Sequence, residues 1–174
     1  WLFGLLLLLI MMIFIGGLTR LTDSGLSITN WKPIYGAIPP LTRGDWILAF
    51  DQYKLTNEFK IQNYQMSFSD FKFIYWWEWG HRQLGRFIGL FWFFGFLYLL
   101  ITTNLPRFFK LFFVFLGLLG LIQAFIGWWM VSSGLDSEKT LLDVASYRLA
   151  IHLNLALIIT SIIFILIKIN NCDD

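Results

Sequence analysis

Residues 76–89 read Trp76-Trp77-Glu78-Trp79-Gly80-His81-Arg82-Gln83-Leu84-Gly85-Arg86-Phe87-Ile88-Gly89. The stretch places a carboxylate, an imidazole and two guanidinium groups at the start of a long apolar run. If it is helical, Glu78 lies three residues from His81 and four from Arg82, so the three side chains cluster on neighbouring faces. Ionisable residues beside an apolar span are costly and usually functional. The stretch therefore predicts polar chemistry at the edge of a membrane.

The spacing beyond His81 indicates what such a site could hold. Gly85 and Gly89 follow the imidazole at i+4 and i+8, which leaves a flat slot for a partner helix or a planar macrocycle. Arg82 and Arg86 could then pair with carboxylates on whatever fills the slot. In the alternative interpretation, the tryptophans form an aromatic belt, the arginines reach lipid headgroups, and the glycines only let two helices approach.

The composition sets the class of protein. Of 174 residues, 57% are hydrophobic, which predicts an integral membrane protein in contact with lipid. The net charge is only +2, and no Lys or Arg run is present, so we exclude nucleic acid as a partner. A single cysteine, Cys172, excludes a disulfide, a zinc site or a thiolate haem ligand within one chain. Because the chain opens at Trp1 without a signal-peptide pattern, we expect a truncated start.

Four apolar segments predict an all-α, four-transmembrane-helix bundle with a long outer loop between its first two helices. The segments are about 1–18, 79–103, 108–131 and 148–168. The basic 104–110 loop should lie inside together with both termini. The 19–77 loop should then lie outside, together with the 132–147 loop, which carries Asp136, Glu138 and Asp143 against Lys139.

Within the 19–77 loop, prolines and glycines interrupt any long regular element. We expect a compact cap with short helices, in which Asp45 to Tyr53 and Ser69 to Trp77 form amphipathic pieces on the membrane or over a site. A plain solvated loop is the alternative. In the third apolar segment, Gly117, Gly120 and Gly127 are expected to serve helix packing, and Gln123 a structural role.

The only two histidines occupy matching positions. His152 lies about one turn inside the fourth apolar segment, as His81 does in the second, and small residues follow it at Ala156 and Thr160. A lone buried histidine is usually a core residue, but a pair at equal depth favours two axial ligands of one haem iron. Arg82, Arg86 or Arg148 would then pair with the haem propionates.

Four blocks carry a resemblance to a known family. In the family's order and over the whole length, they are Gly16 to Pro33, Glu78 to Arg86, Gly127 to Leu135 and Tyr147 to Leu153. On these blocks the chain resembles the N-terminal half of the haem A synthases, membrane enzymes of cytochrome oxidase assembly. The family's loop cysteine pair, found in some members, has no counterpart between Thr19 and Trp77.

The resemblance implies an oxidoreductase of two tandem four-helix bundles that oxidises a methyl group of haem O to a formyl group. It implies that His81 and His152 ligate the substrate haem, that Glu78 is the catalytic carboxylate, and that a haem B cofactor belongs to a second bundle beyond Asp174, without which the chain would be inactive. It also implies a bacterial or mitochondrial inner membrane, a haem site near the outer face, haem O synthase as a donor, and an electron donor of unknown identity.

Other functions compete with this one. A cytochrome b-type electron carrier also needs two histidines at equal depth, but it has no need of Glu78 one turn from its ligand. A di-iron site would use the same Glu-x-x-His spacing, yet the apolar segments contain no further acids at that depth. A structural or assembly protein remains the alternative if the second bundle does not exist.

Overall fold

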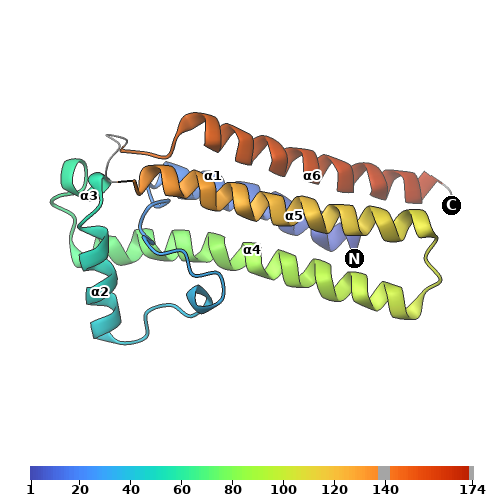
Figure 1. The fold of residues 1–174 in the computed structure, drawn as a ribbon, viewed down its shortest axis with the longest axis horizontal. Helices are drawn as coiled ribbons and strands as arrows, with labels where there is room; N and C mark the ends of the chain where they lie inside the picture. Colours follow the sequence, from blue (N-terminus) through green and yellow to red (C-terminus); the bar gives the residue numbers. More distant parts are fainter. Residues whose placement is uncertain (137–141, 173–174) are drawn as a thin grey trace.

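The computed structural model describes residues 1–136 and 142–172, and within them the chain is helical, with no strand (Figure 1). Glu138 and Lys139, which entered the charge pattern above, lie outside the described residues. The elements are α1 Leu2–Leu21, the 3-10 helix η1 Tyr35–Ala37, α2 Arg43–Tyr53, α3 Asn57–Ile61, α4 Phe68–Thr102, α5 Arg107–Gly134 and α6 Ser146–Cys172.

Four of the described helices, α1, α4, α5 and α6, are long and apolar enough to cross a membrane, which confirms the predicted four-helix architecture. Large apolar side chains such as Phe14, Phe94 and Phe125 are exposed on them. Side chains of this kind suit a lipid surface, because lipid imposes no cost on an exposed apolar group.

The α4 helix is longer than predicted. Its 35 residues span roughly 52 Å at 1.5 Å per residue, well beyond the hydrocarbon thickness of about 30 Å. Residues Ser69 to Trp77, expected to form a separate amphipathic piece, are instead the first turns of this helix. The helix begins early because Ser67 and Asp70 form a capping box, in which each side chain bonds the backbone N–H of the other residue.

The four long helices form a ring in which α1 packs on α4, α4 on α5, α5 on α6, and α6 on α1. α4 and α6 therefore face each other across the bundle. The bundle core, which includes Leu5, Phe96, Phe113 and Ile163, lies towards the end that holds both chain ends and the α4–α5 loop (Figure 1). The opposite end is where the long connection after α1 folds.

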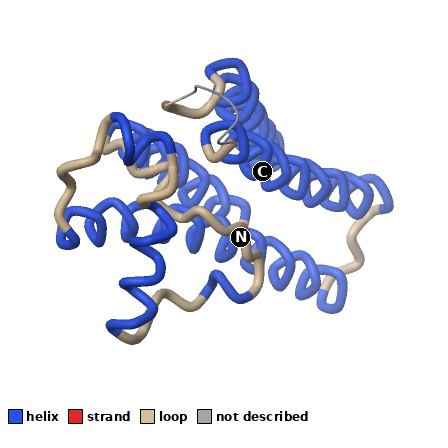
Figure 2. The backbone as a smooth tube through the Cα atoms, turned by 60° about the vertical axis from the view of Figure 1, so that its left-hand side comes forward, coloured by secondary structure: helices blue, strands red, loops and turns tan. Residues whose placement is uncertain are grey.

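We call that connection, residues 22–67, the cap. Figure 2 shows it as short helices joined by loops, in contrast to the long helices of the bundle. A second core anchors it, because Trp46, Phe50 and Tyr53 of α2 pack on Phe71 and Tyr75 in the first turns of α4. The cap is thus packed on the same helix that carries Glu78 and His81.

We expect Gly117 to matter for packing and Gly120 not to. A Cβ on Gly117 would collide with the Trp92 ring of α4, whereas a Cβ on Gly120 would meet nothing within 4 Å. Within a helix, alanine is also about 1 kcal/mol more favourable than glycine, and this gain applies at both positions. Thermal unfolding in detergent should therefore show a lower Tm for Gly117→Ala and an unchanged or higher Tm for Gly120→Ala. Equal Tm values for the two variants would contradict this account of the α4–α5 contact.

Candidate functional site

The site begins with a buried ion pair on α4. Glu78 is only 3% exposed, and Arg82, one turn further along, donates from Nε and Nη2 to its Oε1, with the Nε distance 3.1 Å. The helical spacing that predicted this proximity is sufficient to explain it. A charge removed from water needs such partners, since burial without them is costly.

The other oxygen of Glu78 is held from the cap. Ser27 Oγ and the backbone N–H of Ile28 both donate to Oε2, each at 2.7 Å, and Arg82 Nη2 in turn donates to the Ile28 carbonyl oxygen at 3.1 Å. Every partner of the carboxylate is a donor, which is the environment that favours an anion. Ser27 and Ile28 lie about fifty positions away in sequence, and residue spacing gave no sign of this contact.

The chain turn after α1 brings Ser27 and Ile28 to Glu78. Asp23 follows the helix with a φ of 48°, the left-handed conformation that aspartate tolerates better than most residues. The backbone N–H of Ser24 then donates to the carbonyl oxygen of Thr19 at 3.0 Å, which closes the helix end. The chain is thereby redirected across α4.

Each histidine lies against a glycine of a neighbouring helix. A Cβ on Gly16 of α1 would sit 3.1 Å from His81 Nε2, and a Cβ on Gly127 of α5 would sit 2.9 Å from His152 Cε1. His81 and His152 stand on helices that face each other across the bundle. Glu78, His81 and Arg82 thus share one stretch of α4, and His152 stands on the facing helix α6.

The glycines expected below His81 are placed differently. A Cβ on Gly85 would lie 3.1 Å from Met12 Cε, so the space beside Gly85 faces α1, and a Cβ on Gly89 would meet nothing within 4 Å. The glycines that lie against the imidazoles are Gly16 and Gly127. Sequence spacing identified neighbours along one helix, whereas these contacts come from the packing of different helices.

Gln123 of α5, for which the sequence predicted only a structural role, contacts His152. Its Nε2 donates to the backbone carbonyl of His152 at 2.9 Å and lies 3.5 Å from His152 Nε2. Gln123 Oε1 and His152 Nδ1 are both buried and have no hydrogen-bond partner within the described residues. One signal was available: Gln123 is an isolated amide four residues before Gly127, hence on the same helical face.

Arg86 and Arg148 donate to backbone carbonyls. Arg86 bonds the carbonyl oxygens of Pro33 at 2.9 Å and Lys32 at 3.3 Å, which ties the cap to α4, while its Nη1 is buried without a described partner. Arg148 Nη1 bonds the Trp129 carbonyl at 2.6 Å, and its guanidinium lies 4.3 Å from the centroid of the Trp129 ring.

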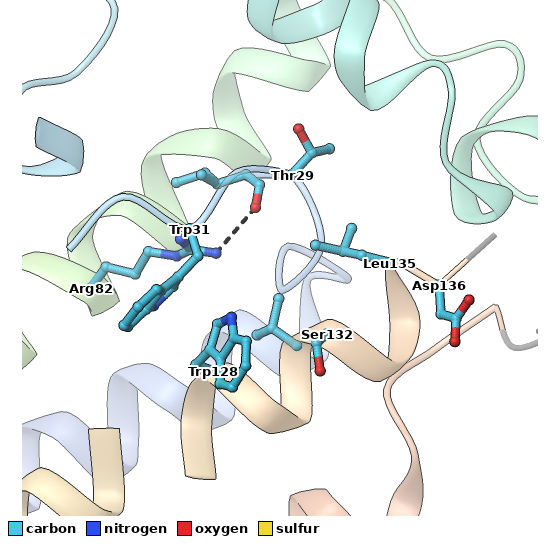
Figure 3. A pocket seen from close by; sticks show the side chains of 9 residues that line it. Thr29, Trp31, Arg82, Trp128, Ser132, Leu135 and Asp136 are labelled. Atoms are coloured by element: carbon cyan, nitrogen blue, oxygen red, sulfur yellow. Dashed lines mark hydrogen bonds between the residues drawn. The ribbon is translucent and has the colours of Figure 1, made fainter. Parts of the chain in front are cut away.

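A pocket of about 240 Å³ lies beside the ion pair. Figure 3 shows Arg82 reaching from α4 towards the Ile28 carbonyl, with Trp31 and Trp128 beside it. The two indole rings are 5.6 Å apart between centroids. Arg82 thus contacts Glu78 and also lines a pocket bounded by the cap and the end of α5.

A second buried carboxyl, Glu58 of α3, lies in the cap. It is 3% exposed, and its Oε2 has no hydrogen-bond partner in the described chain. Burial is the main reason that the pKa of Glu58 is raised to about 8, and the negative charges of Glu78, Asp23 and Asp143 add to the effect. Glu58 is therefore expected to be largely protonated at neutral pH, unlike an exposed glutamate.

Comparison with known proteins adds independent information. The COX15-CtaA family model, described as a cytochrome oxidase assembly protein, matches residues 1–171. A heme A synthase from Roseobacter denitrificans is 55% identical over 163 residues, which cover 94% of this chain and 43% of that protein. The heme A synthase from Dinoroseobacter shibae is 56% identical, and the match covers 94% of this chain and 42% of that protein. The one from a Ruegeria species is 52% identical, and the match covers 91% of this chain and 42% of that protein.

The chain therefore spans about two fifths of the length of these curated relatives. No solved structure gives a significant match.

The burial of Glu58 should make stability depend on pH. Because its pKa in the fold, about 8, exceeds the usual 4.5, the protonated form is favoured in the folded state. The associated stability is fully present below the usual value and is lost as pH rises through about 8. Between about pH 6 and about pH 9, Tm in detergent should fall more for the natural protein than for Glu58→Gln. Asp51→Asn, at an exposed cap carboxylate, should retain the natural pH dependence; an equally steep fall in Glu58→Gln would refute the assignment.

Proposed function

The chain belongs to the cytochrome oxidase assembly protein family, and we propose that it forms the haem O-binding part of a haem A synthase. The proposed reaction oxidises a methyl group of haem O to a formyl group, which gives the haem A needed for cytochrome oxidase. The observation that carries the proposal is the buried carboxylate of Glu78, held by four donor contacts, one turn from His81.

The side chains of the bundle fit a haem held by two imidazoles. His81 and His152 come from helices that face each other, and each ring lies against a glycine, Gly16 or Gly127, of a helix between them. His152 Nδ1 is buried without a described partner, so this imidazole is not committed to a structural hydrogen bond through that nitrogen. When bound, haem O would supply the iron that the imidazoles ligate and the methyl group that reacts.

Glu78 has two possible roles, and its surroundings suit both. As a base, it would accept a proton released while the methyl group is oxidised. As a fixed anion, it would stabilise positive charge that develops on that carbon. Ser27, Ile28 and Arg82 hold both oxygens in place, so little reorganisation is needed in either case. The cap, packed on the first turns of α4, would restrict water around the carboxylate.

Arginines at the cap end would bind the haem propionates. Among Arg82, Arg86 and Arg148, we favour Arg86, because its Nη1 is buried without a described partner and can donate to a carboxylate. Arg82 is already paired with Glu78, and Arg148 with the Trp129 carbonyl. Gly85 and Gly89 would contribute only by limiting bulk on the α4 face below His81.

The remaining assignments follow from the family. A second bundle would hold haem B, haem O synthase would deliver the substrate, and a separate donor or acceptor would exchange electrons. The protein would lie in a bacterial or mitochondrial inner membrane, with the haem site near the outer face, in contact with lipid through its exposed apolar side chains. The rival function, an electron carrier with two histidine ligands, gives no reason to hold a carboxylate with four donors beside its ligand.

Ligation by His81 and His152 predicts a spectral change on substitution. His81→Met and His152→Met should each alter the low-spin bis-imidazole spectrum, because a thioether is a weaker donor than an imidazole. The measurement is visible and EPR spectroscopy of the protein purified at its natural length. Gln83→Met, at a neighbouring α4 residue that bonds the Gly36 and Ala37 carbonyls, is the control and should keep the spectrum. An unchanged spectrum in the double histidine variant would exclude these ligands.

Glu78→Gln tests the proposed function itself. It keeps the side-chain shape and removes the charge, so haem O should remain bound while haem A formation falls roughly 10²-fold or more. The products are identified by extracting haem from membranes and detecting the formyl derivative. Glu58→Gln, which replaces the other buried carboxyl by an amide, is the matched control and should still yield haem A. A normal rate in Glu78→Gln would leave Glu78 as a structural partner of Arg82.

A further inference from the structure

We propose that Gln123 is a positioning residue for His152, whose amide oxygen accepts the imidazole Nδ1–H and so leaves Nε2 to ligate the haem iron. The inference rests on the proposed function in one respect, that His152 is an axial ligand. Gln123 would give the His152 imidazole a hydrogen-bond acceptor, so the two axial imidazoles would differ in their surroundings.

The orientation of the Gln123 amide is determined by its backbone partner. A carbonyl oxygen can only accept, so the 2.9 Å contact to the His152 carbonyl must be made by the amide nitrogen. An amide flipped by 180° would place two acceptors against each other. Gln123 Oε1 therefore points away from the His152 carbonyl, and it is the oxygen that is buried without a described partner.

The proposal includes one tautomer of the ring. Gln123 Nε2 lies 3.5 Å from His152 Nε2, at the outer limit of a hydrogen bond. In the proposed tautomer His152 Nε2 carries the lone pair and can accept from this amide. In a neutral imidazole the proton is then on Nδ1, which makes Nδ1 a donor and Nε2 the nitrogen that can bind a metal.

The two unpartnered atoms are complementary. In this tautomer His152 Nδ1 is a buried donor and Gln123 Oε1 is a buried acceptor, and each destabilises the fold while it lacks a hydrogen bond. Gly127, one turn from Gln123 on the same face, presents no side chain to the ring, and a Cβ there would lie 2.9 Å from His152 Cε1. A turn that releases Nε2 to the iron and brings Nδ1–H to Oε1 satisfies both atoms.

The arrangement matches a general property of metal-bound histidines. Such imidazoles nearly always donate their second N–H to an oxygen, and that bond fixes the ring and makes it a stronger electron donor to the metal. No hydrogen bond joins the His81 ring to another side chain among the described residues, and the amide of Gln83 bonds the carbonyls of Gly36 and Ala37. Gln123 therefore strengthens one axial ligand and not the other.

The test uses the protein purified at its natural length with haem bound. Gln123→Leu removes both polar atoms of the amide, so His152 loses its hydrogen-bond acceptor and becomes a weaker electron donor to the iron. The variant should therefore raise the midpoint potential of the haem ligated by His152, shift its EPR g-values, and weaken haem retention roughly 10- to 100-fold. Gln123→Glu retains an oxygen that can accept from Nδ1–H, and it should restore the potential and g-values towards the natural ones. Asn154→Leu is the control, because Asn154 is an exposed amide on α6 that bonds only the Ala150 carbonyl among the described contacts.

His152→Met separates failure of this inference from failure of the proposed function. The haem signal that changes in His152→Met identifies the haem to be followed, and no change there would mean that His152 is not a ligand. If that signal changes but Gln123→Leu keeps the natural potential and g-values, Gln123 has no positioning role. If Gln123→Leu does not fold, Gln123→Met and Gln123→Glu give the same comparison: Met should behave as expected for Leu, and equal potentials for Met and Glu would overturn the proposal.

Discussion

The burial of one carboxylate in an apolar bundle is the constraint on which the site depends. Glu78 is almost fully removed from water, and a charge in that position requires several donors in fixed places. Arg82 supplies one set from the same helix, and Ser27 and Ile28 supply the other from the cap. Satisfying Glu78 therefore also determines where the chain must run after α1, and it joins the cap to the bundle at the proposed reaction centre.

The cap has its own means of attachment, which is why it can position Ser27 and Ile28. Aromatic side chains of α2 pack on the first turns of α4, and Arg86 holds the 32–33 backbone through two carbonyl oxygens. These contacts use backbone acceptors and apolar surface, so they place few demands on the identity of the loop residues. The long N-terminal extension of α4 serves both as the support of the cap and as the carrier of Glu78 and His81.

Glycines explain how two imidazoles can share the bundle interior. Gly16 and Gly127 belong to α1 and α5, the helices between those that carry His81 and His152. Each glycine lets an imidazole lie directly against a helix backbone, where an added Cβ would come within 3.1 Å of the ring. The small residues that matter are therefore across from each histidine, and the neighbouring Gln123 adds a polar contact to one of the two rings.

The length of the apolar runs was enough to predict the four spanning helices. Helical spacing was enough to predict the pairing of Glu78 with Arg82, because residues three or four apart on a helix must be neighbours. Charge and composition were enough to exclude a soluble class. Only the tertiary structure decided that Ser27 and Ile28 bind Glu78, that Met12 faces Gly85, that Gln123 contacts His152, and that Ser69 to Trp77 continue α4. Those contacts join segments from different helices, and they depend on how the helices dock and turn about their axes, which spacing within one helix does not specify.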